Sequence, residues 1–409
     1  MLVKPSLLFI SPRFLFPMDQ GGKIRTGNIL RGLKGGVFSV TLASPAPNGH
    51  QRHADEIEAA CDRFLFWPEE HASQLRRVLA LTRYSPVAVE TDQSATGTLT
   101  VLEALCEKPD VLVVDFPHTD VLVPSRIDVC RVMFTHNVEA EIFERHVFRS
   151  TGLRRLIWID QSSKMARFEQ AALSRYDSVI AVSARDRGVL AQRYQLAVVE
   201  AIDTGVDLEL FTMNPPDGEL DPGSGTLVFV ATMSWAANVD GIHFLLDEVW
   251  PLLLAKRPNI RAVIIGRNPP LSLSDKIKER GLNVTLTGFV DNIRPYVANA
   301  NVYVIPLFVG SGTRIKAFEA MALGRPVVST TLGLEGLNVT DGKHFLRGDD
   351  AQAFAQSILR LLGDASLRGR IAGAARALME EQFSWSRVAR QFEGICERAL
   401  AAFHGRRSG

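Results

Sequence analysis

The sequence has few cysteines, no long apolar run and almost no net charge. Its four cysteines are far apart without paired spacing, so buried or free thiols in a reducing, cytoplasmic compartment are expected. No apolar run reaches the roughly 20 residues that a membrane-spanning helix needs. A net charge of +1 gives no overall attraction to nucleic acid, so no nucleic-acid partner is expected and any anion binding must be local.

Length and composition predict a globular protein of two domains. A chain of 409 residues is long for one core and suggests two domains of about 200 residues each. Hydrophobic residues make up 46% and charged residues 22%, which is typical of a soluble globular protein. The apolar segment 7–10 is too short for the core of a signal sequence, and Pro12 and Arg13 follow it closely. We expect it to form the first buried strand.

Residues 301–330 predict a strand, a loop, a helix, a turn and a second strand. The β-branched and aromatic run 301–305 predicts one buried strand, and residues 326–329 predict the next. Gly324 is expected to end the helix between them, and Pro326 prevents its continuation. The same alternation of strands and helices recurs along the chain, so the predicted class is α/β.

The loop before this helix and its first turn predict an anion site. Gly310, Ser311 and Gly312 have little or no side chain, which leaves backbone N–H groups open to a ligand. Arg314 and Lys316 follow in the first turn, where cations ordinarily work against the helix dipole. We interpret this mismatch as the mark of a bound phosphate. The alternative is an ordinary βαβ unit with solvated charges.

The helix itself has a polar and an apolar side. At 100° per residue, Thr313, Lys316 and Glu319 lie on one side, and the core-facing side carries Ile315, Phe318 and Ala322. The polar side is therefore free to stabilise the charge of a leaving phosphate. A bound metal ion could also stabilise the charge of the leaving phosphate. However, no closely spaced Asp-x-Asp follows a strand, so a reaction without metal is expected.

Three further segments place polar or small residues where predicted strands end. Gly21 and Gly22 start a helix after a long first loop, although such a turn alone is more often a plain loop. The buried strand 111–115 ends on the carboxylate Asp115. His136 follows another strand at the end where open α/β sheets bind ligands. Its position leaves a site role and a structural role open.

Three runs of sequence carry a resemblance to a known family. They are Gly-Ser-Gly-Thr-Arg-Ile-Lys at 310–316, Phe-Glu-Ala-Met-Ala-Leu-Gly-Arg-Pro-Val-Val-Ser-Thr at 318–330, and Gly-Leu-Glu-Gly-Leu at 333–337. Together they resemble the nucleotide-sugar site of retaining glycosyltransferases of family four, and the resemblance extends over most of the chain.

This resemblance implies the GT-B fold, in which two Rossmann-like, doubly wound domains face each other across a cleft. The first domain would cover residues 1–210 and the donor domain residues 226–382, with a linker at 211–225. A final helix at 383–409 would return to the first domain. Gly205-Val-Asp207 with Phe211 resembles the hinge motif of the family, and the Pro- and Gly-rich run that follows is typical of a linker.

The resemblance also implies roles for individual residues. Arg314 and Lys316 would act on the leaving phosphate, with His136 as a third candidate catalytic residue. Glu319 would accept hydrogen bonds from the ribose of the donor. The whole expected donor side comprises Gly21, Gly22, Gly310, Ser311, Gly312, Thr313, Glu319 and Glu335. The expected acceptor side comprises Lys23, Arg25 and Glu139.

The implied reaction moves a sugar from a nucleotide-diphosphate sugar to a saccharide or lipid-linked saccharide, in cell-surface polysaccharide biosynthesis. It would retain the anomeric configuration without a protein nucleophile, a cofactor or a metal. Two departures leave the donor open. The loop 232–238 lacks the Arg and Lys with which many members grip the diphosphate, and Ser311 stands where members often have a glutamate.

Residues 145–167 mix basic and apolar side chains. One interpretation is a solvated helix with one face in the core; the other is contact with the inner face of an anionic membrane that holds a lipid-linked acceptor. The residues concerned are Arg145, Arg149, Arg154, Arg155, Lys164 and Arg167, with Phe148, Leu153, Leu156, Ile157 and Trp158.

Two other functions remain open within the same architecture. A nucleotide-sugar epimerase would need an acid and a base, for which His136 and a few carboxylates are available. A non-catalytic nucleotide-sugar sensor would keep the phosphate turn without acceptor chemistry. A nicotinamide dehydrogenase is disfavoured, because neither strand-to-helix turn has the dinucleotide glycine spacing.

Overall fold

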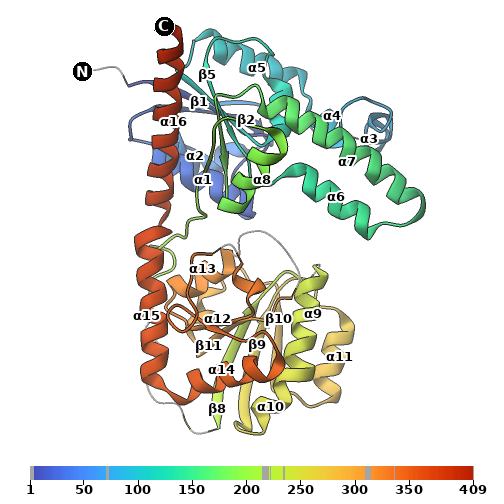
Figure 1. Ribbon diagram of the computed structural model, residues 1–409, viewed down its shortest axis with the longest axis vertical. Coiled ribbons are helices and arrows are strands. Elements are labelled where there is room, and N and C mark those ends of the chain that lie inside the picture. The colour runs from blue at the N-terminus through green and yellow to red at the C-terminus, as the bar shows by residue number, and fades with distance from the viewer. Residues whose placement is uncertain are drawn as a thin grey trace. The chain divides into compact units, whose positions relative to one another are not determined.

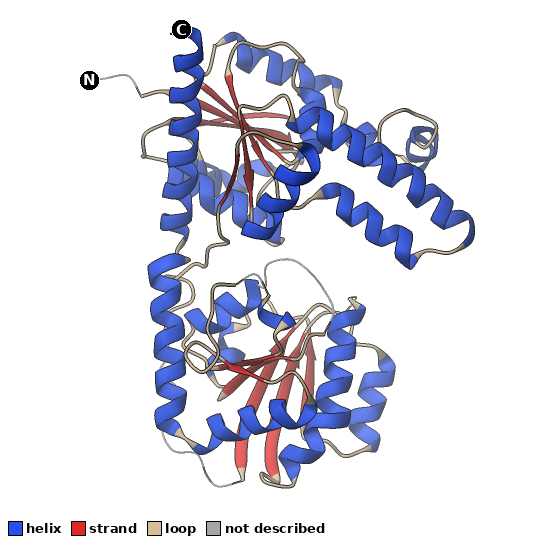
Figure 2. Ribbon diagram, viewed as in Figure 1, coloured by secondary structure: helices blue, strands red, loops and turns tan. Residues whose placement is uncertain are grey.

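The computed structural model describes residues 4–70, 73–213, 221, 223–233, 235–308, 315–335 and 337–408. The chain divides into two compact units (Figure 1). The first unit combines Met1–Thr204 with Trp385–Gly409, and the second unit is Gly205–Ser384. Each unit holds a parallel sheet with helices packed on it (Figure 2), which confirms the predicted α/β class.

The sheet of the first unit has seven parallel strands in the order β3-β2-β1-β4-β5-β6-β7. Phe9 pairs with Leu42 on one side and with Val113 on the other, which fixes the register at the centre. The central strands β1 and β4 are mostly apolar, as expected of a parallel sheet with helices on both faces. The strands are β1 (Ser6–Ile10), β2 (Ser39–Ala46), β3 (Arg63–Pro68), β4 (Val111–Asp115), β5 (Cys130–Phe134), β6 (Ser178–Ala181) and β7 (Val199–Ala201).

Two apolar clusters fill the space between this sheet and its helices. In one cluster, Phe392 packs on Phe134 with ring centroids 5.2 Å apart. The helices of the unit are α1 (Gly21–Leu33), α2 (Ala54–Ala60), α3 (Gln74–Ala80), α4 (Val87–Asp92), α5 (Ala95–Cys106), α6 (Glu139–Arg149), α7 (Gly152–Leu173), α8 (Ala184–Tyr194) and α16 (Trp385–Ser408), with the 3-10 turns η1 (His50–His53) and η2 (Pro117–Leu122).

The last helix, α16, belongs to the first unit although it follows the second unit in the sequence. Val388, Phe392 and Ile395 are buried in the same cluster as Leu30 and Leu33 of α1. The first unit therefore has a core built from both ends of the chain.

The sheet of the second unit has six parallel strands in the order β10-β9-β8-β11-β12-β13. Its strands are β8 (Ser224–Val230), β9 (Asn259–Ile265), β10 (Val284–Gly288), β11 (Val302–Ile305), β12 (Val327–Ser329) and β13 (Leu346–Arg347). One cluster that includes Trp250, Phe318 and Phe354 forms the core. Val206 and Phe211, from the segment that resembles a hinge, are also buried in it, and the Val206 N–H donates to the Phe383 carbonyl at 2.7 Å.

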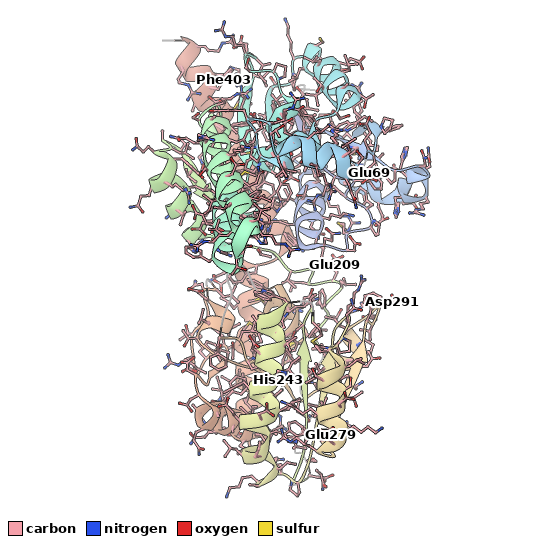
Figure 3. All side chains as sticks on the ribbon, turned by 90° about the vertical axis from the view of Figure 1, so that its right-hand side faces the viewer. Glu69, Glu209, His243, Glu279, Asp291 and Phe403 are labelled. Atoms are coloured by element: carbon pink, nitrogen blue, oxygen red, sulfur yellow. The ribbon has the colours of Figure 1, made fainter. Side chains whose placement is uncertain are left out.

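The helices of the second unit are α9 (Ala236–Phe244), α10 (Trp250–Leu254), α11 (Leu271–Glu279), α12 (Arg294–Ala298), α13 (Ile315–Ala322), α14 (Ala351–Gly363) and α15 (Ala365–Gln382), with the π turn η3 (Leu245–Val249) and the 3-10 turn η4 (Leu332–Leu334). Gly324 follows α13 with φ of +71°, the left-handed conformation expected of a residue that ends a helix. Figure 3 shows His243 of α9 and Glu279 of α11. Asp247 of η3 accepts hydrogen bonds from Lys276 of α11 and from Arg280.

Two further expectations concern cysteines and membrane spans. All four cysteines are free thiols, and Cys61, Cys130 and Cys396 are buried. Among the described helices, none has both the length and the apolar character that a membrane span requires.

Candidate functional site

The polar side of α13 holds a buried carboxylate beside a half-exposed amine. Glu319 is 8% exposed, and its Oε2 atom accepts a hydrogen bond from Nζ of Lys316 at 2.9 Å. Burial raises the pKa of the Glu319 carboxyl, and Lys316 opposes this effect. On the other side of α13, Phe318 and Ala322 are buried in the core, as the helical pattern predicts. Lys316 and Glu319 thus lie together, with the amine open to solvent.

The remaining expected donor residues of the second unit are placed as follows. Glu335 is exposed directly after η4. Before it, the Gly333 N–H donates to Oγ1 of Thr330 at 3.0 Å. The predictions on Gly310, Ser311, Gly312, Thr313 and Arg314 fall outside the described residues.

The carboxyl ends of β8, β9 and β10 carry one cation that sequence reasoning missed. The Arg267 guanidinium lies 3.9 Å over the centre of the Phe289 ring, directly after β9 and β10. In the nearby loop after β8, Nδ2 of Asn238 donates to the Thr232 carbonyl at 2.8 Å. Arg267 could have been recognised as a candidate site residue in the sequence, because it follows Gly266 at the end of a predicted strand.

In the first unit, His136 lies in a buried polar network. Its Nε2 atom is 2.7 Å from Oδ1 of Asp115, and its Nδ1 atom is 3.2 Å from NH1 of Arg25. Arg25 also donates to Oγ1 of Thr204 at 2.7 Å, and Thr26 donates to Oδ2 of Asp115 at 3.0 Å. Because a guanidinium can only donate, Nδ1 is the acceptor, and we assign the ring proton to Nε2, which donates to Asp115.

Burial decides the charge state of this network. Burial lowers the pKa of the His136 imidazole, against the opposing effect of Asp115. Burial also lowers the pKa of Arg25 to about 10, so its guanidinium stays charged at neutral pH. His136 is therefore a neutral ring whose two nitrogens are both engaged. Sequence reasoning missed this pairing, although Asp115 ends the strand next to that of His136.

The two glycines at the start of α1 differ in their surroundings. The Phe116 ring stacks on His136 at 4.1 Å between centroids and 10° between planes. A Cβ atom on Gly22 would lie 3.2 Å from Cζ of Phe116, so this glycine lets α1 approach the stack closely. Gly21 is exposed. The structure thus gives Gly22 a packing role beside Phe116 and His136.

The expected acceptor-side residues separate into different environments. Arg25 is buried in the His136 network, whereas Lys23 forms an ion pair with Asp19 at 3.4 Å. Glu139 is the first residue of α6, and its backbone N–H donates to Oε1 of Glu169 at 2.9 Å. Burial and the nearby Glu169 raise the pKa of Glu139 to about 7. Such a carboxyl can take up or release a proton at neutral pH.

Comparison with known proteins gives a family match that lies within the second unit. Residues 224–364 match the family described as glycosyl transferases group 1. The phosphatidyl-myo-inositol mannosyltransferase of Mycolicibacterium smegmatis is 28% identical over 52% of this chain and 56% of its own length. The lipopolysaccharide 1,2-N-acetylglucosaminetransferase of Salmonella typhimurium is 25% identical over 49% of this chain and 57% of its own length. The chain thus spans about half the length of the curated relatives that it matches.

A solved structure resembles nearly the whole chain. Anabaena Alr3699/HepE in complex with UDP aligns with a TM-score of 0.67 and 15% identity, over 96% of this chain and 100% of that one. At this identity the likeness shows the fold alone, and it confirms the two Rossmann-like domains of the GT-B type. The match of residues 224–364 confirms the predicted resemblance to glycosyltransferases.

Proposed function

We propose, because residues 224–364 carry a glycosyl transferases group 1 domain, that this protein is a retaining glycosyltransferase of family four. It would move a sugar from a nucleotide-diphosphate sugar to a saccharide or lipid-linked saccharide in the biosynthesis of a cell-surface polysaccharide or glycolipid. The observation that supports this best is the Lys316–Glu319 pair on α13, inside the matched domain. A buried carboxylate with one charged partner is a suitable acceptor for the vicinal hydroxyls of a ribose.

In the proposed reaction, basic residues of the protein stabilise the negative charge on the leaving diphosphate. Lys316 has an exposed amine within the first turn of α13, where it would stabilise the charge that develops on the leaving phosphate. We extend the same role to Arg314 from the sequence alone. His136 would act as a neutral positioning residue that holds Arg25 and Asp115 in place, because both of its ring nitrogens are engaged by them. No cofactor or metal is required in this mechanism.

A thermal-shift panel with UDP, GDP, ADP, TDP and CMP tests the donor site. A ligand that binds only the folded protein stabilises it by about 2.7 kcal/mol at a hundred times its Kd. We expect one diphosphate to raise the melting temperature equally with and without EDTA. Stabilisation by none of the five would contradict the donor site, and an EDTA-sensitive shift would contradict the metal-free mechanism. Turnover of the matching sugar nucleotide, with the anomer identified by NMR, then separates transfer with retention from epimerisation and from binding alone.

We further propose that the first unit contacts an anionic membrane through residues 145–167. These residues form the end of α6 and most of α7, whose first residue, Gly152, has φ of +57°. Phe148, Leu153 and Leu156 are 85%, 75% and 63% exposed, and basic side chains neighbour them in the sequence. Exposed apolar side chains among basic ones are typical of segments that lie on anionic lipid. The protein would then be peripheral on the cytoplasmic face of the membrane.

A further inference from the structure

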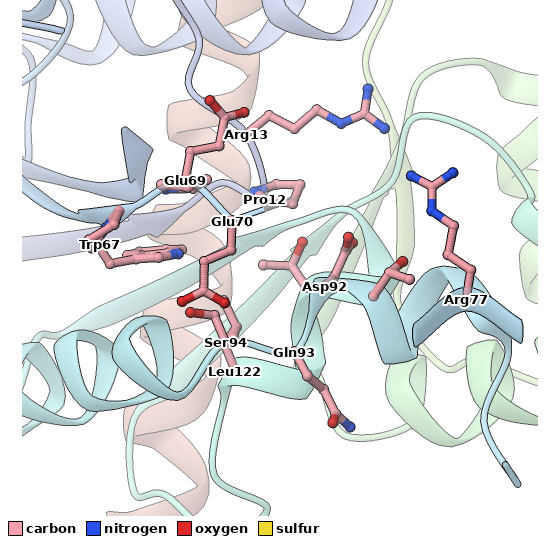
Figure 4. Close-up of a pocket in the computed structure, with 14 residues that line it drawn as sticks. Pro12, Arg13, Trp67, Glu69, Glu70, Arg77, Asp92, Gln93, Ser94 and Leu122 are labelled. Carbon is pink, nitrogen blue, oxygen red and sulfur yellow. The ribbon is translucent and has the colours of Figure 1, made fainter. Parts of the chain in front are cut away.

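A cavity of about 290 Å³ opens in the first unit at the carboxyl ends of β1, β2 and β3 (Figure 4). Its wall includes Trp67, Glu70, Arg77, Asp92 and Thr119. None of these residues belongs to the His136 network or to the expected site. The carboxyl edge of a parallel sheet is where α/β proteins bind ligands, and this volume is at the lower end of small-molecule sites, which run from roughly 300 to 1,000 Å³.

The carboxylate of Asp92 stands in this cavity without a hydrogen-bond donor among the described residues. The imidazole of His118 lies beside it, with its Nδ1 atom 3.5 Å from Oδ2, and the Arg13 guanidinium of the cavity wall acts on it through its charge. His118 is more than nine-tenths buried, and its Nδ1 atom has no hydrogen-bond partner. Burial lowers the pKa of His118 to about 4, so the ring is neutral and does not compensate the carboxylate. The Nδ1 atom of His118 is therefore left without a partner next to Asp92, and the Asp92 carboxylate, whose side chain is 36% exposed, is open to a ligand in the cavity.

The rest of the lining mixes apolar and polar groups of both charges. Trp67 and Leu122 supply apolar surface, and amide and hydroxyl groups come from Thr91, Gln93 and Ser94. Figure 4 shows Glu69 and Glu70 on one side of Asp92 and Arg77 on the other. The three carboxylates disfavour a phosphate, and the two arginines of the lining, Arg13 and Arg77, offset the attraction for a cation. A neutral molecule with several hydroxyls and an apolar face matches this lining.

We propose that this cavity binds one neutral sugar residue of the acceptor, with Asp92 accepting hydrogen bonds from its hydroxyls. Since this inference rests on the proposed function, the sugar would be a unit of the saccharide that receives the transferred residue. The phenyl ring of Phe116 lies between the two regions, 4.1 Å from His136 and 5.1 Å from His118 between ring centroids. A saccharide held in the cavity would thus extend along the same edge of the sheet as His136.

Saturation-transfer NMR on the full chain tests the cavity directly. The neutral probes are methyl glucoside, methyl galactoside, methyl mannoside and N-acetylglucosamine, and glucosamine is the cationic comparison, each at millimolar concentration. We expect at least one probe to give a signal, Asp92→Asn to weaken its binding at least tenfold, and Gln93→Trp to abolish it by filling the cavity. Glu103→Gln, an exposed carboxylate on α5, is the matched control and should leave binding unchanged. Gln93 is exposed, so the tryptophan variant is expected to fold even if Asp92→Asn does not.

The outcomes separate this site from the donor site. Undiminished binding in both cavity variants would overturn the cavity as the sugar site. Binding of glucosamine without any neutral probe would overturn the neutral class in favour of an amine. If a nucleoside diphosphate stabilises the protein but no sugar probe binds, the cavity inference fails and the transferase stands. If a sugar binds in the cavity but no nucleoside diphosphate stabilises the protein, the cavity is supported and the proposed function fails.

Discussion

The Nε2 atom of His136 lies 2.7 Å from Oδ1 of Asp115, while Arg25 contacts the other nitrogen of the same ring at 3.2 Å. Both nitrogens of a buried imidazole are therefore committed to the protein. A ring held in this way has a fixed orientation. It must give up one of these contacts before it can accept a second proton or donate the proton on Nε2 to a substrate. We accordingly treat His136 as a positioning residue that acts through Asp115 and Arg25.

The Asp115→Asn substitution is expected to destabilise the first unit by about 3 kcal/mol. It removes a buried charge that compensates the Arg25 guanidinium and leaves that cation unpaired. Urea denaturation followed by circular dichroism measures the loss. Asp128→Asn is the control, because Asp128 and Arg407 form an exposed ion pair worth at most about 1 kcal/mol. Equal stability of the two variants would show that the His136 network does not depend on its carboxylate.

The Lys316→Ala and Glu319→Ala substitutions are each expected to abolish most transfer while leaving the protein folded. The fold is expected to tolerate both changes, because Lys316 is half exposed and because burial disfavours the charged form of Glu319. Initial rates with varied donor separate the two roles: a lower kcat is expected for the lysine variant and a higher KM for the glutamate variant. Lys278→Ala, on the exposed side of α11, should keep full activity. Full activity in all three variants would refute the site on α13.

The stability of the first unit should fall between pH 7 and pH 4.5 because of His118. Burial lowers the pKa of His118 to about 4, below its unfolded value of about 6.5. The unfolded state therefore binds more protons in this window, and the contribution of His118 is present above pH 6.5 and lost as the pH falls. The loss at pH 4.5 is about 2 kcal/mol.

Asp92 opposes this effect, because burial raises its pKa to about 6 and the folded state then binds more protons in the same window. The measurement is therefore made in the Asp92→Asn background, with and without His118→Phe. Urea denaturation at both pH values should show a smaller loss on acidification in the double variant. Identical losses would mean that His118 titrates normally in the folded protein.

The Gly266→Ala substitution is expected to cost about 3 kcal/mol or more of the free energy of unfolding. Its Cβ atom would lie 1.8 Å from the Ala231 carbonyl oxygen, so the backbone at the ends of β8 and β9 must move. Gly373→Ala is the matched control, because a Cβ atom there meets nothing within 4 Å inside α15. That variant should gain about 0.5–1 kcal/mol from helix propensity. Thermal unfolding of both variants tests the pair.

The Leu153→Ser/Leu156→Ser double variant is expected to bind anionic vesicles at least fivefold less than the natural protein. Both side chains are exposed on α7, so the change removes apolar surface without touching the core. Flotation with vesicles of phosphatidylglycerol and phosphatidylethanolamine measures the bound fraction. Leu271→Ser, which changes a leucine that is 82% exposed on α11, is the control. If the natural protein does not float with these vesicles, the membrane contact is refuted.

Much of the fold could be predicted because buried parallel strands have a plain sequence signature. The strand predicted at 111–115 is β4 with the same bounds, since both of its faces are covered and every residue is buried. Gly324 was readable as a helix end because its left-handed conformation favours glycine. The break between α6 and α7 was missed. Its signal in the sequence was the glycine at position 152, which has φ of +57° in the structure.

The polar network of the first unit could not be predicted in the same way. His136 is 21 positions from Asp115 and 111 from Arg25 along the chain, and only the strand order brings the three together. Local patterns report which face of a strand or helix is buried, not which distant side chain will meet it. The cavity beside Asp92 is a further example, because its lining comes from six separate segments of the chain.

The place of α16 has a consequence for how the protein is made. During synthesis, Gly205–Ser384 emerges as one continuous stretch and can close its own core first. Leu30 and Leu33 of α1 lack the cover of Val388 and Phe392 until residues 385–408 have been made. The core of the first unit is thus completed only after the second unit has been made, and in the interval its uncovered apolar side chains are prone to aggregation.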